Sequence, residues 1–111
     1  MKTKGYVYLL VQIDSEGNEL HKIGISKNHP DARVKQLQTG NPNEIRLLSF
    51  YESINYKKVE QFIHSRYSLS KTLADNEWFI LANEQVMSFR EDCKKADETI
   101  GFLKENNHFF K

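Results

Sequence analysis

Residues 5–26 read GYVYLLVQIDSEGNELHKIGIS and carry the pattern of a β-hairpin. Aromatic and aliphatic residues alternate at 6–11, and a second apolar run at 20–25 follows a turn at 14–18. The connection is too short for a crossover, so the two runs are expected to pair as antiparallel strands. This hairpin therefore predicts a small, mainly antiparallel sheet.

Patterns of helix and strand follow the hairpin. Pro30 suits a first helical turn and Gly40 suits a left-handed stop, which together predict a short helix between them. The later elements are expected as a strand at 44–53, a helix at 54–69, a short strand at 77–81 and a closing helix at 83–106. Asn83 can cap the closing helix. This order predicts an α+β fold.

The second helix has one apolar face with a carboxylate at its border. The residues expected on this face are Val59, Phe62, Ile63 and Tyr67. At about 100° per residue, Glu60 falls beside the face and His64 lies one turn further along the same edge. Glu60 is therefore expected to reach the sheet without full burial.

The length of 111 residues predicts one domain spanning residues 1–111. Cys93 is the single cysteine, which excludes an internal disulfide and a four-cysteine zinc site and fits a reducing compartment. The sequence has no apolar run of membrane-spanning length and no signal-peptide pattern at its start. We therefore expect a cytoplasmic protein with no membrane partner.

Charge is divided unevenly along the chain. Residues 1–72 hold 11 Lys and Arg against 7 Asp and Glu, a net charge of +4. Residues 73–111 hold 5 against 8, a net charge of −3. A basic first part suits a polyanionic partner that binds to the first two-thirds of the chain.

Four polar residues have the chemistry of a phosphodiester site. Glu60 offers hard oxygen ligands to Mg²⁺, which needs few protein ligands. Arg33 offers a planar fork to phosphate oxygens. A tyrosine hydroxyl such as that of Tyr8 can position or deprotonate a water if a cation lies near it, and Lys22 on the paired strand is such a cation. Gly24, beside Lys22, is expected to give a ligand room.

These residues lie in a series of short motifs. The motifs are Tyr6-Val7-Tyr8, Lys22-Ile23-Gly24, Arg33 with Leu37-Gln38-Thr39-Gly40-Asn41-Pro42, Glu60 with His64, and Glu77-Trp78-Phe79. In this order they resemble the GIY-YIG nuclease superfamily, and in particular its phage-associated T5orf172 or Mug113-like branch. The resemblance spans residues 5–81.

The resemblance implies a three-stranded antiparallel sheet flanked by helices and metal-dependent cleavage of nucleic acid, with double-stranded DNA as the expected partner. It implies that Tyr8 activates the attacking water, that Arg33 holds the scissile phosphate and that Glu60 binds Mg²⁺, for which Mn²⁺ can substitute. A phage or mobile-element context is implied in the same way. Lys22 stands where the family motif has tyrosine, which leaves the general base open between Tyr8 and Lys22.

Other residues keep more than one interpretation. Tyr6, His64 and Glu77 are possible catalytic or phosphate contacts. His64 could orient Glu60, contact phosphate, act as a base or satisfy a hydrogen bond at the edge of the core. His21 is expected on the opposite strand face from Lys22 and exposed.

Two other functions compete with the nuclease. The first is a non-catalytic nucleic-acid-binding or regulatory module on the same fold, because Lys22 departs from the motif and no separate recognition domain is evident. The second is a zinc or other metal-binding protein built on Glu60 and His64, although further ligands of the right spacing are missing. The choice between DNA and RNA, the target sequence, the oligomeric state and the biological role stay open.

Overall fold

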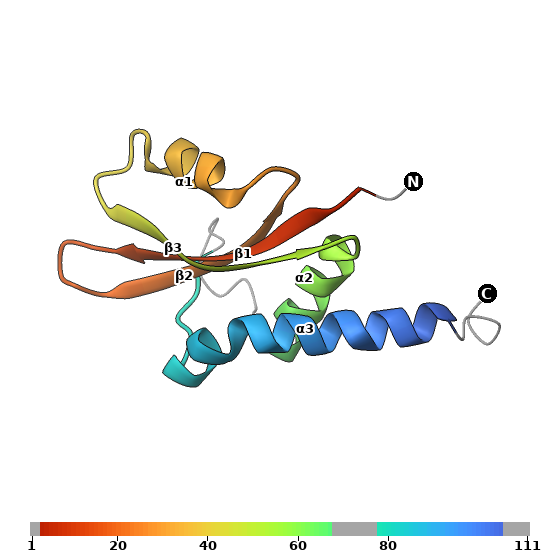
Figure 1. The fold of residues 1–111 in the computed structure, drawn as a ribbon. Helices are drawn as coiled ribbons and strands as arrows, with labels where there is room; N and C mark the ends of the chain where they lie inside the picture. The colour runs from red at the N-terminus through yellow and green to blue at the C-terminus, as the bar shows by residue number, and fades with distance from the viewer. Residues whose placement is uncertain (1–2, 68–77, 106–111) are drawn as a thin grey trace.

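The computed structural model describes residues 3–67 and 78–105 of the chain. A three-stranded antiparallel sheet forms its centre, with one helix on one face and two helices on the other (Figure 1). The elements in chain order are β1 (Gly5–Ile13), β2 (Glu19–Ser26), α1 (Pro30–Gln38), β3 (Glu44–Ser53), α2 (Tyr56–Arg66) and α3 (Asn83–Glu105). The predicted α+β fold with a three-stranded antiparallel sheet flanked by helices is confirmed.

The hairpin predicted from residues 5–26 forms the central and one outer strand of the sheet. The strand order is β2-β1-β3, and β1 pairs antiparallel with both neighbours. Between β1 and β2 the carboxylate of Asp14 accepts hydrogen bonds from the backbone N–H groups of Glu16 and Asn18, each at 2.9 Å. Gly17 takes the positive φ of 83° that this turn needs.

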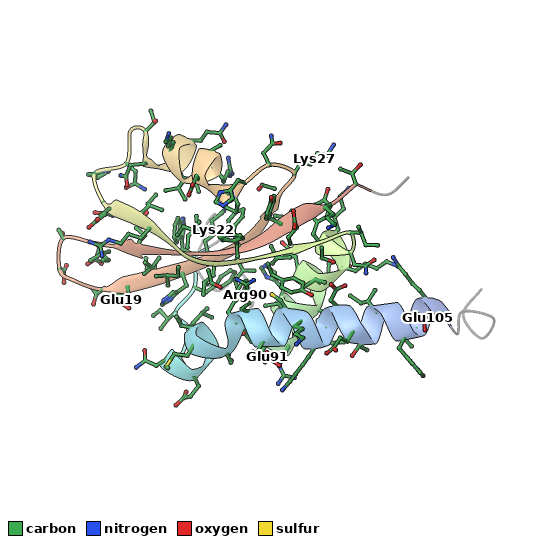
Figure 2. The ribbon with its side chains drawn as sticks, in the orientation of Figure 1. Glu19, Lys22, Lys27, Arg90, Glu91 and Glu105 are labelled. Carbon is green, nitrogen blue, oxygen red and sulfur yellow. The ribbon has the colours of Figure 1, made fainter. Side chains whose placement is uncertain are left out.

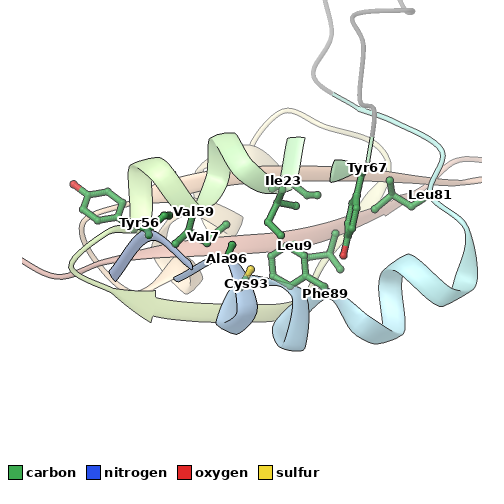
Figure 3. Packing of buried hydrophobic residues seen from close by; sticks show 12 residues of the cluster. Val7, Leu9, Ile23, Tyr56, Val59, Tyr67, Leu81, Phe89, Cys93 and Ala96 are labelled. Atoms are coloured by element: carbon green, nitrogen blue, oxygen red, sulfur yellow. The ribbon is translucent and has the colours of Figure 1, made fainter. Parts of the chain in front are cut away.

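The main core lies between the sheet and the pair of helices α2 and α3 (Figure 3). Fully buried side chains come from all three layers, and examples are Leu9 of β1, Ile63 of α2 and Phe89 of α3. Each such side chain contributes roughly 1.5–3 kcal/mol to stability through burial. A second, smaller apolar cluster lies under α1 and includes Tyr8, Leu10, Ile45, Val34 and Leu37.

The buried face of α2 differs from the one expected. Phe62 is 42% exposed, whereas Tyr56, which was not expected on this face, is 7% exposed. At about 100° per residue, Tyr56 lies about 60° from Val59 on the side of Glu60, and Phe62 lies about 60° away on the opposite side. Because the Tyr56 ring packs against Gly5 at the start of β1, α2 is turned so that its Glu60 edge moves toward the sheet.

This orientation of α2 predicts different costs for two adjacent truncations. Ile63→Ala is expected to lower the free energy of unfolding by about 2–5 kcal/mol, because Ile63 is fully buried. Phe62→Ala is expected to lower it by less than Ile63→Ala does, because Phe62 is 42% exposed and removes less of its apolar surface from water. Urea unfolding of both variants measures the difference, and equal losses would contradict the observed face.

The strand expected at 77–81 is not formed by the described part of this segment. Phe79 instead makes an isolated antiparallel bridge to His21 on the outer edge of β2, with two backbone N–H···O bonds of 2.6 Å. The expectation that His21 is exposed is also wrong, since His21 is only 4% exposed. The bridge explains this burial, because the chain around Phe79 covers the edge of the strand at His21.

Some expected positions lie outside the described residues. They are Glu77, the last residues of the helix expected at 54–69, and residue 106 of the closing helix. Within the described residues, no helix has the length and apolar character needed to cross a membrane.

Candidate functional site

Tyr8 and Lys22 lie on the face of the sheet that α1 covers. Tyr8 is paired with Gly24, and Leu10, two residues along β1, is paired with Lys22, so Tyr8 and Lys22 are diagonal neighbours on this face. They are 2% and 5% exposed, and the Lys22 Nζ atom lies 6.0 Å from the centre of the Trp78 ring. Figure 2 labels Lys22 near the middle of the sheet. A lysine is rarely buried to this extent, since its charge must be compensated inside the protein. Lys22 is therefore not a solvated residue of the strand.

Gly24 is required by the position of the Tyr8 ring. A Cβ atom at residue 24 would lie 2.5 Å from the Tyr8 hydroxyl oxygen and 2.7 Å from Cζ, closer than non-bonded atoms approach. The sequence predicted that Gly24 gives a ligand room, but in the structure the Tyr8 hydroxyl occupies this space. Because Gly24 has no side chain, the Tyr8 hydroxyl can lie against the backbone of β2. Gly24 is two residues from Lys22 along this strand.

Arg33 is presented from α1 on the same side of the sheet. The helix begins at Pro30, and the His29 side chain caps it by accepting a hydrogen bond from the Asp31 N–H at 3.2 Å. Arg33 is half-buried, and its Nη1 atom donates to Gln36 Oε1 at 3.2 Å. The capping role of His29 was not found in the sequence, although a capping side chain is expected just before a proline at the first helical position.

Tyr6 belongs to an aromatic cluster beside this cap. Its ring centre lies 5.7 Å from that of His29 and 5.9 Å from that of Phe50. Loss of solvent around the hydroxyl and the nearby carboxylate of Glu52 raise the pKa of Tyr6. A raised pKa keeps the phenol protonated at neutral pH, so Tyr6 is suited to donate a hydrogen bond and is unsuited to act as a base.

Glu60 and His64 lie at the outer edge of β2, on α2. The His64 Nε2 atom is 3.2 Å from the carbonyl oxygen of Ile23, and because a carbonyl can only accept, this nitrogen carries the proton and donates. The Glu60 Oε2 atom is 3.5 Å from the same nitrogen. The Glu60 and His64 side chains are 24% and 29% exposed, so the carboxylate is accessible to solvent.

This hydrogen bond narrows the roles left open for His64. Its Nε2 proton is directed at Ile23, so this nitrogen is not available to accept a proton from water. The ring also packs edge-on against Phe79, with ring centres 6.0 Å apart. Both contacts anchor His64 to the strand edge, which supports a role in orienting Glu60.

The two groups of candidate residues meet at the tripeptide Lys22-Ile23-Gly24. The Lys22 side chain lies on the α1 face, the Ile23 side chain lies in the main core on the other face, and the Ile23 carbonyl receives the His64 bond. Tyr8, Lys22 and Arg33 therefore belong to one face of the sheet, and Glu60 approaches from the layer behind it at the β2 edge. The catalytic roles of these residues stay predictions.

The donor set around Glu60 bears on the metal that it could bind. Among the described residues, no group of three or more His, Cys, Asp and Glu side chains is placed to hold a metal ion. This lends no support to a zinc centre, which takes at least three protein ligands. Mg²⁺ keeps most of its waters and is held by one or two carboxylates, so a single accessible carboxylate such as Glu60 fits it.

Two further titratable groups are structural. Burial, followed by the charges of Asp92 and Asp97, raises the pKa of Cys93 to about 12, so this thiol is protonated and unreactive at neutral pH. Asp92 is 7% exposed and accepts hydrogen bonds from the Tyr67 hydroxyl at 2.7 Å and the Ser88 hydroxyl at 2.8 Å. This network ties the end of α2 to α3, and no pattern in the sequence marked Asp92.

The strands, α1, α2 and the first half of α3 lie within the range that one protein-family model matches. The model of the T5orf172 domain family matches residues 5–94. The chain belongs to the T5orf172 domain family. The match contains every candidate site residue named above, which agrees with the T5orf172-like motifs of the sequence. No curated protein and no solved structure matches the chain.

Proposed function

We propose that this T5orf172 domain protein is a GIY-YIG-type endonuclease that hydrolyses phosphodiester bonds of double-stranded DNA with a divalent metal ion. Membership of the T5orf172 domain family is consistent with a nuclease-related or DNA-binding role. The observation that carries the proposal is a buried lysine, Lys22, next to Tyr8, with Glu60 held at the same strand by His64. A buried lysine needs its charge compensated inside the protein, and the place of Lys22 diagonal to Tyr8 supports a role at the site.

The proposed reaction is attack of water on phosphorus with release of the sugar oxygen. Arg33 holds the scissile phosphate through its guanidinium group, which can bind two phosphate oxygens at once. Tyr8 and Lys22 activate the water, and one of the two, in its deprotonated form, accepts the proton that the water loses. If that residue is Tyr8, the Lys22 ammonium group supplies positive charge beside it. His64 acts through Glu60 as a positioning residue, because it contacts Ile23 and the carboxylate.

Glu60 would hold the metal ion, which is Mg²⁺ in this proposal, with Mn²⁺ as a substitute. When bound there, the ion would supply positive charge to the phosphate and to the leaving oxygen. The accessibility of the Glu60 carboxylate supports this assignment, since Mg²⁺ needs few protein ligands.

A plasmid-cleavage assay tests the proposal. We expect supercoiled plasmid to be nicked or linearised with Mg²⁺ or Mn²⁺, and no cleavage when EDTA removes the metal ion. Restoring an excess of Mg²⁺ after EDTA should restore cleavage, which controls for loss of the protein itself. Failure to cleave plasmid under any of these metal conditions would overturn the enzymatic proposal.

A second candidate is a non-catalytic nucleic-acid-binding module. It is favoured by the burial of Tyr8 and Lys22, which are 2% and 5% exposed and thus covered on the α1 face. One experiment separates the two candidates. With Mg²⁺, a binding module shifts the DNA band in a gel and leaves the DNA intact, whereas the nuclease cleaves it.

A further inference from the structure

A basic cavity lies at the start of α2, apart from the candidate catalytic residues. Its volume is about 300 Å³, and it is lined by Thr3, Ile54, Asn55, Tyr56, Lys57, Lys58 and Lys104. The described lining residues thus include three lysines and no carboxylate. The lysines come from two elements that are distant in sequence, since Lys57 and Lys58 belong to α2 and Lys104 to α3.

The side chain of Asn55 separates this cavity from nearby acidic groups. Its Nδ2 donates to Asp97 Oδ1 at 2.9 Å, and its Oδ1 accepts from the Lys104 ammonium group. The other carboxylate oxygen of Asp97 accepts from the Tyr51 hydroxyl at 2.8 Å. Both carboxylate oxygens of Asp97 therefore accept hydrogen bonds from other residues. The Lys104 ammonium group bonds to Asn55, and both residues line the cavity.

The same arrangement leaves the beginning of α2 uncapped by a side chain. Asn55 is the capping residue, yet its side chain makes no hydrogen bond to the helix because it is engaged with α3. The first turn of α2, which is described throughout, holds Lys57 and Lys58 and no acidic residue. Cations are unfavourable beside the positive end of a helix, and a bound anion would relieve this repulsion.

Lys57, which lines the cavity, is a neighbour of Glu60 on the surface of α2. Lys57 and Glu60 are three residues apart on α2, a spacing that places Cβ atoms about 5–6 Å from each other. Phosphates of one DNA strand repeat every ~3.4 Å along the axis, so this separation corresponds to a step of one or two nucleotides. The Lys57 Nζ atom also lies 6.0 Å from the centre of the Tyr56 ring, and both residues line the cavity.

From these observations we propose that the lysine cavity at the start of α2 binds a backbone phosphate of the nucleic acid, one or two nucleotides from the reacting phosphate. The proposal rests on the nucleic-acid-binding part of the proposed function and is independent of cleavage. The cavity would hold the DNA strand in register along α2. It would not recognise bases, because lysine contacts to phosphate do not read sequence.

The test is the salt dependence of DNA binding without divalent metal, so that cleavage is not required. A labelled DNA duplex is titrated with wild type and with Lys57→Gln/Lys58→Gln at several salt concentrations, and fluorescence anisotropy gives the affinity. The variant should bind more weakly, and the slope of log affinity against log salt should become shallower by about 0.9, the value for one lost phosphate contact. The loss should be equal for unrelated duplex sequences.

The matched control is Lys94→Gln/Lys95→Gln, which removes the same charge from exposed positions of α3 about 14–15 Å along the helix from Lys104. It should leave the slope at the wild-type value. Lys104→Gln should reproduce the loss from the other side of the cavity, and thermal unfolding confirms that each variant is folded.

Equal slopes for the cavity and control variants would overturn the proposal, as would absence of DNA binding by wild type. If binding behaves as expected but plasmid is never cleaved, the cavity stands and the enzymatic function falls.

Discussion

Replacing Glu60 with glutamine is expected to reduce Mg²⁺-dependent DNA cleavage by about 100-fold or more. Glutamine has the size of glutamate, so the packing of this side chain beside His64 at the β2 edge is kept. It loses the negative charge that a divalent cation needs, and the charge stabilisation that such an ion supplies in a transition state amounts to several kcal/mol. The measurement is the initial rate of plasmid nicking across a range of Mg²⁺ concentrations.

Glu91→Gln is the matched control for this substitution. Glu91 is an exposed glutamate of α3 (Figure 2), so the same change of charge is made away from the β2 edge. Its nicking rate and its Mg²⁺ dependence should equal those of wild type. Undiminished cleavage by Glu60→Gln would show that another group binds the metal ion.

Replacing Gly24 with alanine is expected to damage both stability and cleavage. The new Cβ would lie 2.5 Å from the Tyr8 hydroxyl oxygen, and the Tyr8 ring is buried with Phe50 opposite it on β3. Overpacking of this kind costs about 1–3 kcal/mol of unfolding free energy. Displacement of a catalytic group by about 1 Å can lower a rate by about 100-fold, and such a displacement of Tyr8 is the expected cause of lost cleavage.

Gly101→Ala provides the comparison, because a Cβ at Gly101 meets no atom within 4 Å. This substitution lies inside α3 and should raise stability by about 0.5–1 kcal/mol through helix propensity. Thermal unfolding and plasmid nicking of both variants separate the steric effect from the general effect of replacing glycine. A Gly24→Ala protein with wild-type stability and activity would mean that the Tyr8 hydroxyl does not require its observed position.

Much of the fold follows from local patterns in the sequence. The alternation at residues 6–11 and the short turn after it determine the hairpin, and Pro30 with Gly40 marks α1. The buried face of α2 does not follow from spacing, because Phe62 fits the helical spacing as well as Tyr56 does. Tyr56 is the residue that is buried, because the absence of a side chain at Gly5 leaves space for the Tyr56 ring. That contact joins residues distant in the chain, and no local pattern reports it.

In the candidate site too, local spacing in the sequence predicts some positions, whereas contacts between distant residues determine others. Helical spacing correctly placed Glu60 at the border of the buried face. The burial of Lys22 was not predictable, because it depends on packing around Trp78, far along the chain. The hydrogen bond from His64 to Ile23 was not predictable either, since it joins a side chain to a backbone carbonyl 41 residues away.

The bonds along the outer side of β2 also determine how this sheet can associate with another chain. Edge strands invite addition of foreign strands through their unpaired backbone groups, which leads to aggregation or to assembly. On β2 three of these groups are engaged: the N–H and the carbonyl of His21 bond to Phe79, and the carbonyl of Ile23 bonds to His64. Strand addition there would have to break all three bonds and displace His64 from Glu60. The contacts that hold the candidate carboxylate in place thus also protect the protein from edge-to-edge aggregation at β2.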